Sequence, residues 1–171
     1  MELKGAYHAN DISRYILASS RNIGIRATNL RLQKLLYFVE GFYMLGNNGT
    51  ESCFKEQILA WTYGPVVHEV YDTFKVFGNQ PIEHFDQIFG IDTSKGTIRF
   101  TNTPWDSSVI KPETKEMIDN VNRILRRYPD FALVDMTHDK RGPWARHYGN
   151  PISEVIPKVE IYDYFRMIQN G

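Results

Sequence analysis

The chain has 171 residues, 42% of them hydrophobic, and a folded domain of this length buries about 70% of the surface that its unfolded chain exposes. Twenty basic residues balance twenty acidic ones, which argues against a protein built mainly to grip nucleic acid, since a basic excess is the usual footprint of that class. The single cysteine, Cys53, excludes an internal disulfide, no apolar run approaches the roughly 18 residues of a membrane span, and the first residues lack the layout of a signal peptide, so we expect a cytoplasmic protein without a membrane partner.

Two helices are predicted in the first third of the chain. The first spans about residues 10–20, and the second spans about residues 29–45 behind a cap at Thr28 or Asn29. The second helix is apolar on nearly all sides, which is typical of the central helix of a bundle. Its inward positions follow the helical spacing i, i+3, i+4, i+7 and are Leu32, Leu35, Leu36, Val39 and Tyr43.

The middle of the chain is predicted to be less regular. Residues 54–62 read as a short extended or irregular stretch that leads into Gly64-Pro65. Pro65 suits the first turn of a helix that ends at Gly78. Around residues 88–103 the apolar period shortens to two, which indicates a small β-hairpin or an irregular insertion.

Further helices are predicted in the C-terminal half: one opening at Pro112 or Glu113, a short one over 131–136, and a last one from Pro157, with a turn-rich segment over 139–151 before it. Their inward positions are predicted to be Met117, Ile118, Val121, Ile124, Leu125, Ile161, Tyr164, Phe165 and Ile168. We find no linker or repeat, so the prediction is a mainly α, single-domain helical bundle over residues 1–171.

Two short blocks carry the most information. The first, Leu32–Phe38, is explained by core packing, with Gln33 and Lys34 on the other side of the helix, where they are solvated or reach a neighbouring turn. In the second block, residues 60–67, Trp61 and Tyr63 each combine a large apolar body with one polar tip, as residues in structural corners and at interface hot spots do. The two roles are compatible if the corner displays Tyr63 beside His68.

No catalytic signature accompanies these blocks. The segment His68-Glu69-Val70-Tyr71-Asp72 imitates a zinc-protease HExxH helix but ends in Asp, and the remaining histidines are scattered. We therefore expect no enzyme activity, no metal and no cofactor.

A basic group in the C-terminal half allows two interpretations. Its members either converge into an anion-attracting face or form a solvated surface that Asp130, Asp135 and Asp139 neutralise, and we favour the second. Trp144, in the same region, is either an exposed anchor or an aromatic lid over the core. The basic residues are Arg123, Arg126, Arg127, Lys140, Arg141 and Arg146.

The chain resembles the Panacea domain, the SocA-like antitoxin family that includes many phage-associated proteins. The resemblance rests on residues 9–12, 29–38 and 60–67, with weaker echoes at Thr137-His138 followed by Pro143-Trp144, and at Tyr164-Phe165. It implies a small, mainly helical antitoxin that binds and neutralises a toxin, in many cases encoded by an adjacent gene, and in one branch acts as an adaptor for a cellular protease. Carried onto this chain, the family-like blocks suggest a contact surface of Tyr63, His68, His138 and Trp144.

The alternative function is a phage-associated, nucleic-acid-binding regulator that uses the basic 123–146 region. Net neutrality makes nucleic acid the less favoured partner. Salt dependence separates the two, because binding dominated by phosphate contacts weakens steeply with salt and an apolar protein interface does not.

Overall fold

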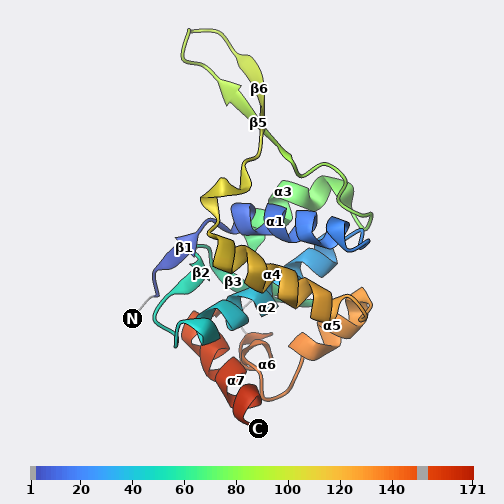
Figure 1. Ribbon diagram of the computed structural model, residues 1–171, viewed down its shortest axis with the longest axis vertical. Coiled ribbons are helices and arrows are strands. Elements are labelled where there is room, and N and C mark those ends of the chain that lie inside the picture. The colour runs from blue at the N-terminus through green and yellow to red at the C-terminus, as the bar shows by residue number, and fades with distance from the viewer. Residues whose placement is uncertain (1–2, 150–153) are drawn as a thin grey trace.

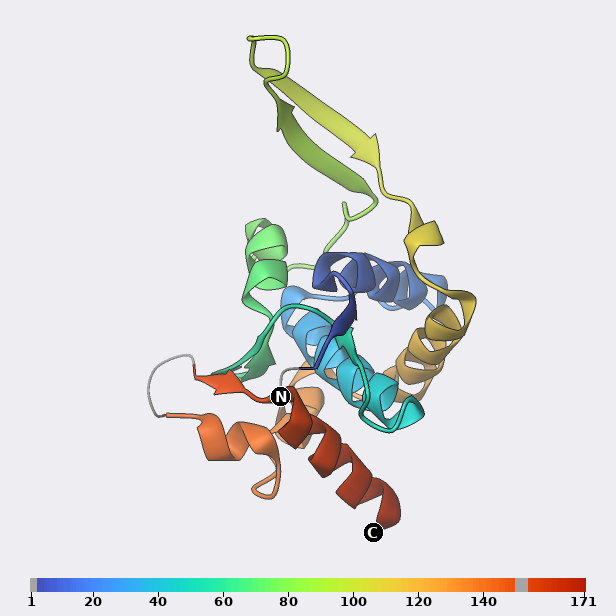
Figure 2. The same ribbon diagram turned by 90° about the vertical axis from the view of Figure 1, so that its left-hand side faces the viewer.

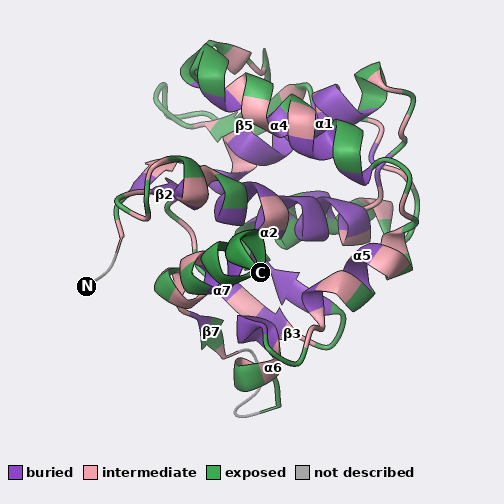
Figure 3. Ribbon diagram, turned by 60° about the horizontal axis from the view of Figure 1, so that its bottom comes forward, coloured by how far each residue is buried: buried purple, intermediate pink, exposed green. Residues whose placement is uncertain are grey.

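The apolar helix predicted from residue 29 forms the centre of the fold. A computed structural model describes residues 3–149 and 154–171, and in it helix α2 (Asn29–Gly46) runs through the middle of the body (Figure 1). Helices α1 (Ala9–Asn22), α4 (Pro112–Leu125) and α7 (Lys158–Asn170) pack against it. Burial colouring shows α2 largely enclosed by its neighbours (Figure 3). The mainly helical class is confirmed.

The first two helices begin close to the predicted positions. The Thr28 hydroxyl accepts a hydrogen bond from the backbone N–H of Arg31 at 3.1 Å, which confirms Thr28 as the cap of α2. Helix α1 starts at Ala9, slightly earlier than expected, because its cap comes from elsewhere in the chain. The carboxylate of Glu56 accepts the N–H of Ala9 at 2.7 Å, and no local sequence signal announces that contact.

Short strands lie beside the helices, so the described part of the chain is more than a simple bundle. Strand β1 (Gly5–Tyr7) pairs in parallel with β2 (Ser52–Phe54). Strand β3 (Ile58–Trp61) pairs antiparallel with both β4 (Gly64–Val66) and β7 (Val155–Ile156). Of the two forms predicted for residues 54–62, extended or irregular, the extended one is observed over Ile58–Trp61.

The prediction that Pro65 opens a helix is wrong. Pro65 lies in strand β4, and helix α3 (His68–Phe74) begins after it and is followed by a 3₁₀ turn over Lys75–Phe77. The reason is the tight hairpin that precedes it: Trp61 pairs with Gly64, whose φ of 99° closes the turn. Pro65 is therefore part of the paired strand β4, and the helix starts only after it.

The predicted hairpin is present and projects from the body. Strands β5 (Gln87–Asp92) and β6 (Arg99–Pro104) pair antiparallel along their whole length and stand clear of the helices (Figure 2). Directly after β6, the indole N–H of Trp105 donates to Asp11 at 2.9 Å. This bond fastens the base of the hairpin to α1.

The C-terminal region contains a helix that the sequence did not reveal. Helix α5 (Asp130–Thr137) matches the prediction, and α7 begins at Lys158 behind Pro157. Within the segment predicted to be turn-rich, Pro143–His147 forms helix α6. The end of that segment, residues 150–153, lies outside the described residues.

Most predicted inward residues of α4 and α7 are buried, with two corrections. Ile118, Val121 and Leu125 face the core, but Ile124 is 59% exposed, and Ile168 at the end of α7 is also exposed. Successive residues of a helix are rotated by about 100°, so a face centred on Ile118 and Leu125 turns Ile124 outward.

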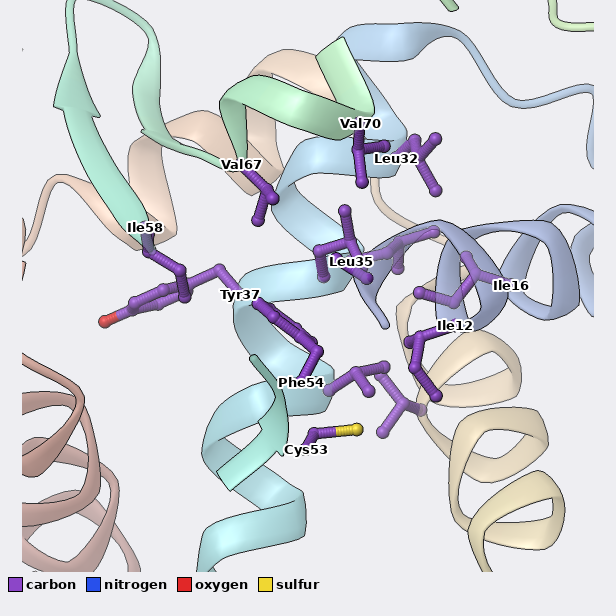
Figure 4. Close-up of a cluster of buried hydrophobic side chains, with 14 of the residues drawn as sticks. Ile12, Ile16, Leu32, Leu35, Tyr37, Cys53, Phe54, Ile58, Val67 and Val70 are labelled. Carbon is purple, nitrogen blue, oxygen red and sulfur yellow. The ribbon is translucent and has the colours of Figure 1, made fainter. Parts of the chain in front are cut away.

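The core gathers where α1, α2, α3 and the short strands meet (Figure 4). Side chains from α1 and α2 interlock there with residues of β2, β3 and α3, and Cys53 is buried among them. Figure 4 labels Ile12, Ile16, Leu32, Leu35, Tyr37, Phe54, Ile58, Val67 and Val70 in this cluster. Among the described residues, none of the helices has the length and apolar character needed to cross a membrane.

Candidate functional site

The central helix carries buried polar side chains, each of which fastens a different neighbour. Arg31 donates to the carbonyls of Leu125 at 3.0 Å and Tyr128 at 2.8 Å, where α4 ends. It also pairs with Asp130 at 3.2 Å, at the start of α5. One guanidinium therefore closes the corner between α4 and α5.

Gln33 and Lys34 are both buried and reach the turn region, so the second of their two predicted environments is the observed one. The Gln33 side-chain carbonyl accepts the N–H of Val67 at 2.8 Å, which fixes the start of α3. The Lys34 amine donates to the carbonyl of Pro65 at 2.8 Å. Burial lowers the pKa of Lys34 to about 7, and no carboxylate among the described residues pairs with it. These two bonds join the two sequence blocks.

Glu40 plays the same part at the other end of α2. Its carboxylate accepts the N–H groups of Cys53 at 3.0 Å and Phe54 at 3.3 Å, and the amine of Lys158 lies 3.6 Å away. Burial raises the pKa of Glu40 to about 7, although Lys158 and the two N–H groups favour its charged form. Strand β2 and helix α7 are held to α2 in this way.

A groove of about 880 Å³ opens where the two blocks meet. It lies between the N-terminal half of α2, the β3–β4 turn and the start of α5, and aromatic side chains dominate its rim. Tyr63 is 59% exposed and Phe131 is 63% exposed, and their rings meet edge to face at 6.2 Å. The groove is lined by Thr28, Asn29, Leu30, Gln33, Lys34, Ala60, Trp61, Thr62, Tyr63, Val66, Tyr71, Gly78, Asn79, Asp130, Phe131, Tyr148 and Gly149. We call this surface the aromatic groove.

An aromatic stack supports one side of the groove. The ring of Trp144 lies parallel to His138 at 3.7 Å and to Tyr148 at 4.6 Å. Its indole N–H donates to the carbonyl of Trp61 at 2.8 Å. Trp144 is only 8% exposed, so it is the lid of the two predicted alternatives, and it holds Tyr148 at the groove.

The surroundings of His138 inside this stack favour its neutral form. Burial lowers its pKa, and the nearby amine of Lys34 lowers it further. Its Nε2 is buried and has no hydrogen-bond partner within the part of the chain that the structure describes. The stacked imidazole therefore favours apolar contacts over charged ones.

The predicted contact residues come together in part. Tyr63 lines the groove, and His138 and Trp144 form the stack beneath Tyr148. His68 is the first residue of α3. It pairs with Asp72 at 3.4 Å and does not line the groove.

The expected pairing of Tyr63 with His68 is not observed. Trp61 takes the place beside His68, at 5.8 Å between ring centroids, while Tyr63 meets Phe131 instead. Phe131 and Tyr148 also line the groove, and neither was predicted from the sequence. Only their aromatic character, close after Pro129 for Phe131 and just before Gly149 for Tyr148, could have pointed to them.

The basic group does not act as one free cationic patch. Arg141 pairs with Asp139 at 2.8 Å, and Arg146 pairs with Glu160 at 3.2 Å. Asp130 bonds Arg31 rather than this group. Four cations remain without an ion pair among the described residues, namely Arg123, Arg126, Arg127 and Lys140. No set of three or more His, Cys, Asp or Glu side chains in residues 3–149 and 154–171 is arranged to hold a metal ion.

The region that contains the central helix, the β3–β4 turn and the Trp144 stack matches a known protein family. The family model described as "Antitoxin SocA-like, Panacea domain" matches residues 32–145, well over half of the chain, and the protein therefore belongs to this family. The matched region begins in α2 and ends just beyond Trp144, so it includes most of the aromatic groove.

A particular relative can also be named. The chain is 28% identical over 138 residues to Antitoxin SocA of Caulobacter vibrioides (strain NA1000 / CB15N), and the match covers 80% of this chain and 68% of that protein. No solved structure matches the chain.

Proposed function

We propose that the protein is an antitoxin that binds a protein toxin at the aromatic groove and neutralises it. The observation that carries this proposal is the convergence of the two family-like blocks on one surface. Lys34 from the first block donates a hydrogen bond to Pro65 of the second, and both Lys34 and Tyr63 line the groove. Membership of the antitoxin family supports a toxin as the partner.

The groove has the features of a protein-binding hot spot. Such spots are rich in Trp and Tyr side chains, which bury a large apolar area while keeping one polar tip. Tyr63 and Phe131 present their rings to solvent, and the hydrogen bonds and stacked rings behind them are already in place. A preformed site loses less conformational entropy on binding.

Neutralisation needs no chemistry from the antitoxin itself, and we propose that the protein is not an enzyme. Two mechanisms fit a binding protein: it covers the active surface of the toxin, or it delivers the toxin to a cellular protease. A chase after translation is stopped separates them. Delivery shortens the half-life of the toxin when the antitoxin is present, whereas covering preserves or lengthens it.

The decisive experiment is co-expression with the product of the adjacent gene, scored by growth rescue and co-purification. Tyr63→Ala and Phe131→Ala should each weaken the complex, since hot-spot truncation costs about 2 kcal/mol, or roughly 30-fold in Kd. Phe100→Ala is the matched control, because that ring is 87% exposed on the projecting hairpin. A folded Tyr63→Ala/Phe131→Ala double variant that binds like the wild type would refute the groove as the contact surface.

The nucleic-acid alternative has weaker support, because Arg141 and Arg146 are already paired with carboxylates. It predicts binding to nucleic acid that falls by about a thousandfold between about 50 and 200 mM salt for six phosphate contacts. A salt titration with a random duplex and a random single strand tests it directly.

A further inference from the structure

The outer face of α4 carries apolar side chains that the fold does not use. The inward face is complete with Ile118, Val121 and Leu125. Ile124 nevertheless points outward and is 59% exposed. Met117, two turns before it on the helix, is only partly buried against the core. In Figure 1, α4 lies on the near side of the body with no segment drawn in front of it.

This apolar surface continues onto the central helix. A hollow of about 340 Å³ separates the outer side of α4 from the exposed ring of Phe42 on α2. It is lined by Phe42, Glu113, Glu116, Met117, Asn120, Val121 and Ile124. None of these residues lines the aromatic groove, so the two surfaces are separate.

The charges on this face are divided between its two ends. Glu113 and Glu116 lie in the first turns of α4, whereas Arg123 lies in its last turn and Arg127 in the turn that follows. All four side chains are exposed, and none forms an ion pair with another described residue. Within the described part of the chain, the Arg123 side chain donates only to Asn120, one turn before it. The outer face of α4 from Glu113 to Arg127, which we call the stripe, is therefore acidic at one end, apolar in the middle and basic at the other end.

We propose that this face binds a second copy of the chain, with the two α4 helices antiparallel about a twofold axis near Asn120. A twofold axis at that residue sets Glu113 opposite the partner's Arg127 and Glu116 beside the partner's Arg123. The apolar centre of one copy, Ile124 and Met117, then covers that of the other. In such an isologous contact every pairing occurs twice, so the stripe complements itself.

The charge pattern favours this occupant over others. A partner of one sign would be attracted at one end of the stripe and repelled at the other. A second copy in antiparallel orientation satisfies both ends without any further residue. Dimerisation by this face would leave the aromatic groove of each copy open, so it is compatible with toxin binding and does not depend on it.

The test is analytical ultracentrifugation of the full chain over about 1 to 200 µM. This range covers the dissociation constants expected for a dimer with an interface of modest size. The wild type should show a concentration-dependent dimer. Glu113→Arg/Glu116→Arg and Arg123→Glu/Arg127→Glu should each weaken self-association more than about tenfold, because like charges then face each other. Mixing the two variants should restore a heterodimer, since the reversed ends are again complementary.

The control is Lys95→Glu/Arg99→Glu on the exposed hairpin. It makes the same change of net charge as Arg123→Glu/Arg127→Glu and should leave the dimer intact. Ile124→Glu should give a monomer with an unchanged circular dichroism spectrum. A wild type that remains monomeric throughout the range would overturn the proposal. A dimer that withstands both charge reversals, or variants that fail to pair when mixed, would overturn it equally.

Discussion

The amine of Lys34 and the carbonyl of Pro65 are 2.8 Å apart, and their hydrogen bond joins the two most informative segments of the sequence. The helix segment supplies a long side chain, and the turn supplies a carbonyl that strand β4 directs inward. The ammonium group has three donors, and this is its one described acceptor. One hydrogen bond offsets little of the cost of burying a charged amine. The free energy of unfolding should therefore depend on pH through Lys34.

Lys34 makes folding less favourable at neutral pH than in base. Its pKa is about 7 in the folded chain, whereas an unfolded lysine titrates near 10.4. The unfolded state therefore binds the proton more readily, and the free energy of unfolding rises as pH increases from about 7 to about 10. Lys34→Met removes this dependence, so its stability relative to the wild type should fall by about 2 to 3 kcal/mol between pH 7 and pH 9.5.

Urea denaturation of both proteins at several pH values measures this difference. Other titrating groups cancel in the comparison, because both proteins contain them. Curves for wild type and Lys34→Met that stay parallel across the range would show that the amine is not desolvated.

Gly64 should tolerate no side chain. Its φ of 99° disfavours any other residue, and an added Cβ would lie 2.5 Å from the hydroxyl oxygen of Thr137 and 2.9 Å from Nζ of Lys34. Gly64→Ala should therefore lower the free energy of unfolding by about 2 to 4 kcal/mol. Gly46→Ala is the control: no atom lies within 4 Å of its added Cβ, so its effect should be neutral or slightly stabilising. Thermal melts of the two variants give the comparison, and equal melting temperatures would contradict it.

The pair of Glu40 and Lys158 should behave as a coupled unit. Lys158→Met leaves a fully buried carboxylate facing two N–H groups without its cation, and we expect a loss of about 3 kcal/mol. Adding Glu40→Gln should recover part of that loss, because the neutral amide needs no counter-charge. A double-mutant cycle by urea denaturation measures the coupling, and strictly additive effects of the two substitutions would exclude it.

Trp144 should contribute through both its stacked ring and its N–H. Trp144→Phe keeps an aromatic ring between His138 and Tyr148 but loses the bond to the Trp61 carbonyl, at a cost of about 1 kcal/mol. Trp144→Ala removes the ring as well and should cost about 3 to 5 kcal/mol. Chemical denaturation ranks the two variants, and a Phe variant as unstable as the Ala variant would assign the main role to the N–H.

Several elements follow from the sequence because their causes are local. Thr28 caps α2 through its own hydroxyl, Pro112 opens α4, and the alternation around residues 88–103 forms the hairpin. In each case the signal lies within a few residues of its effect. The apolar spacing of the central helix likewise placed Leu32, Leu35 and Leu36 in the core.

Other features depend on contacts between distant segments. Pro65 joined a strand because Trp61 and Gly64 pair across a tight turn, and α1 starts at Ala9 because Glu56 caps it from the loop after β2. Periodicity alone placed Ile124 inward, but it cannot say how wide the covered face of α4 is, and the packing of α1 and α2 against that helix decides this.

The sequence by itself determined the family, the mainly helical class and the two blocks that matter. Only the tertiary structure showed that these blocks enclose one aromatic groove and that Phe131 and Tyr148 complete it. The physical reason is that amphipathic spacing reports which side of a helix avoids water, whereas a groove forms between elements whose approach is fixed by buried polar bonds such as those of Arg31, Gln33 and Lys34.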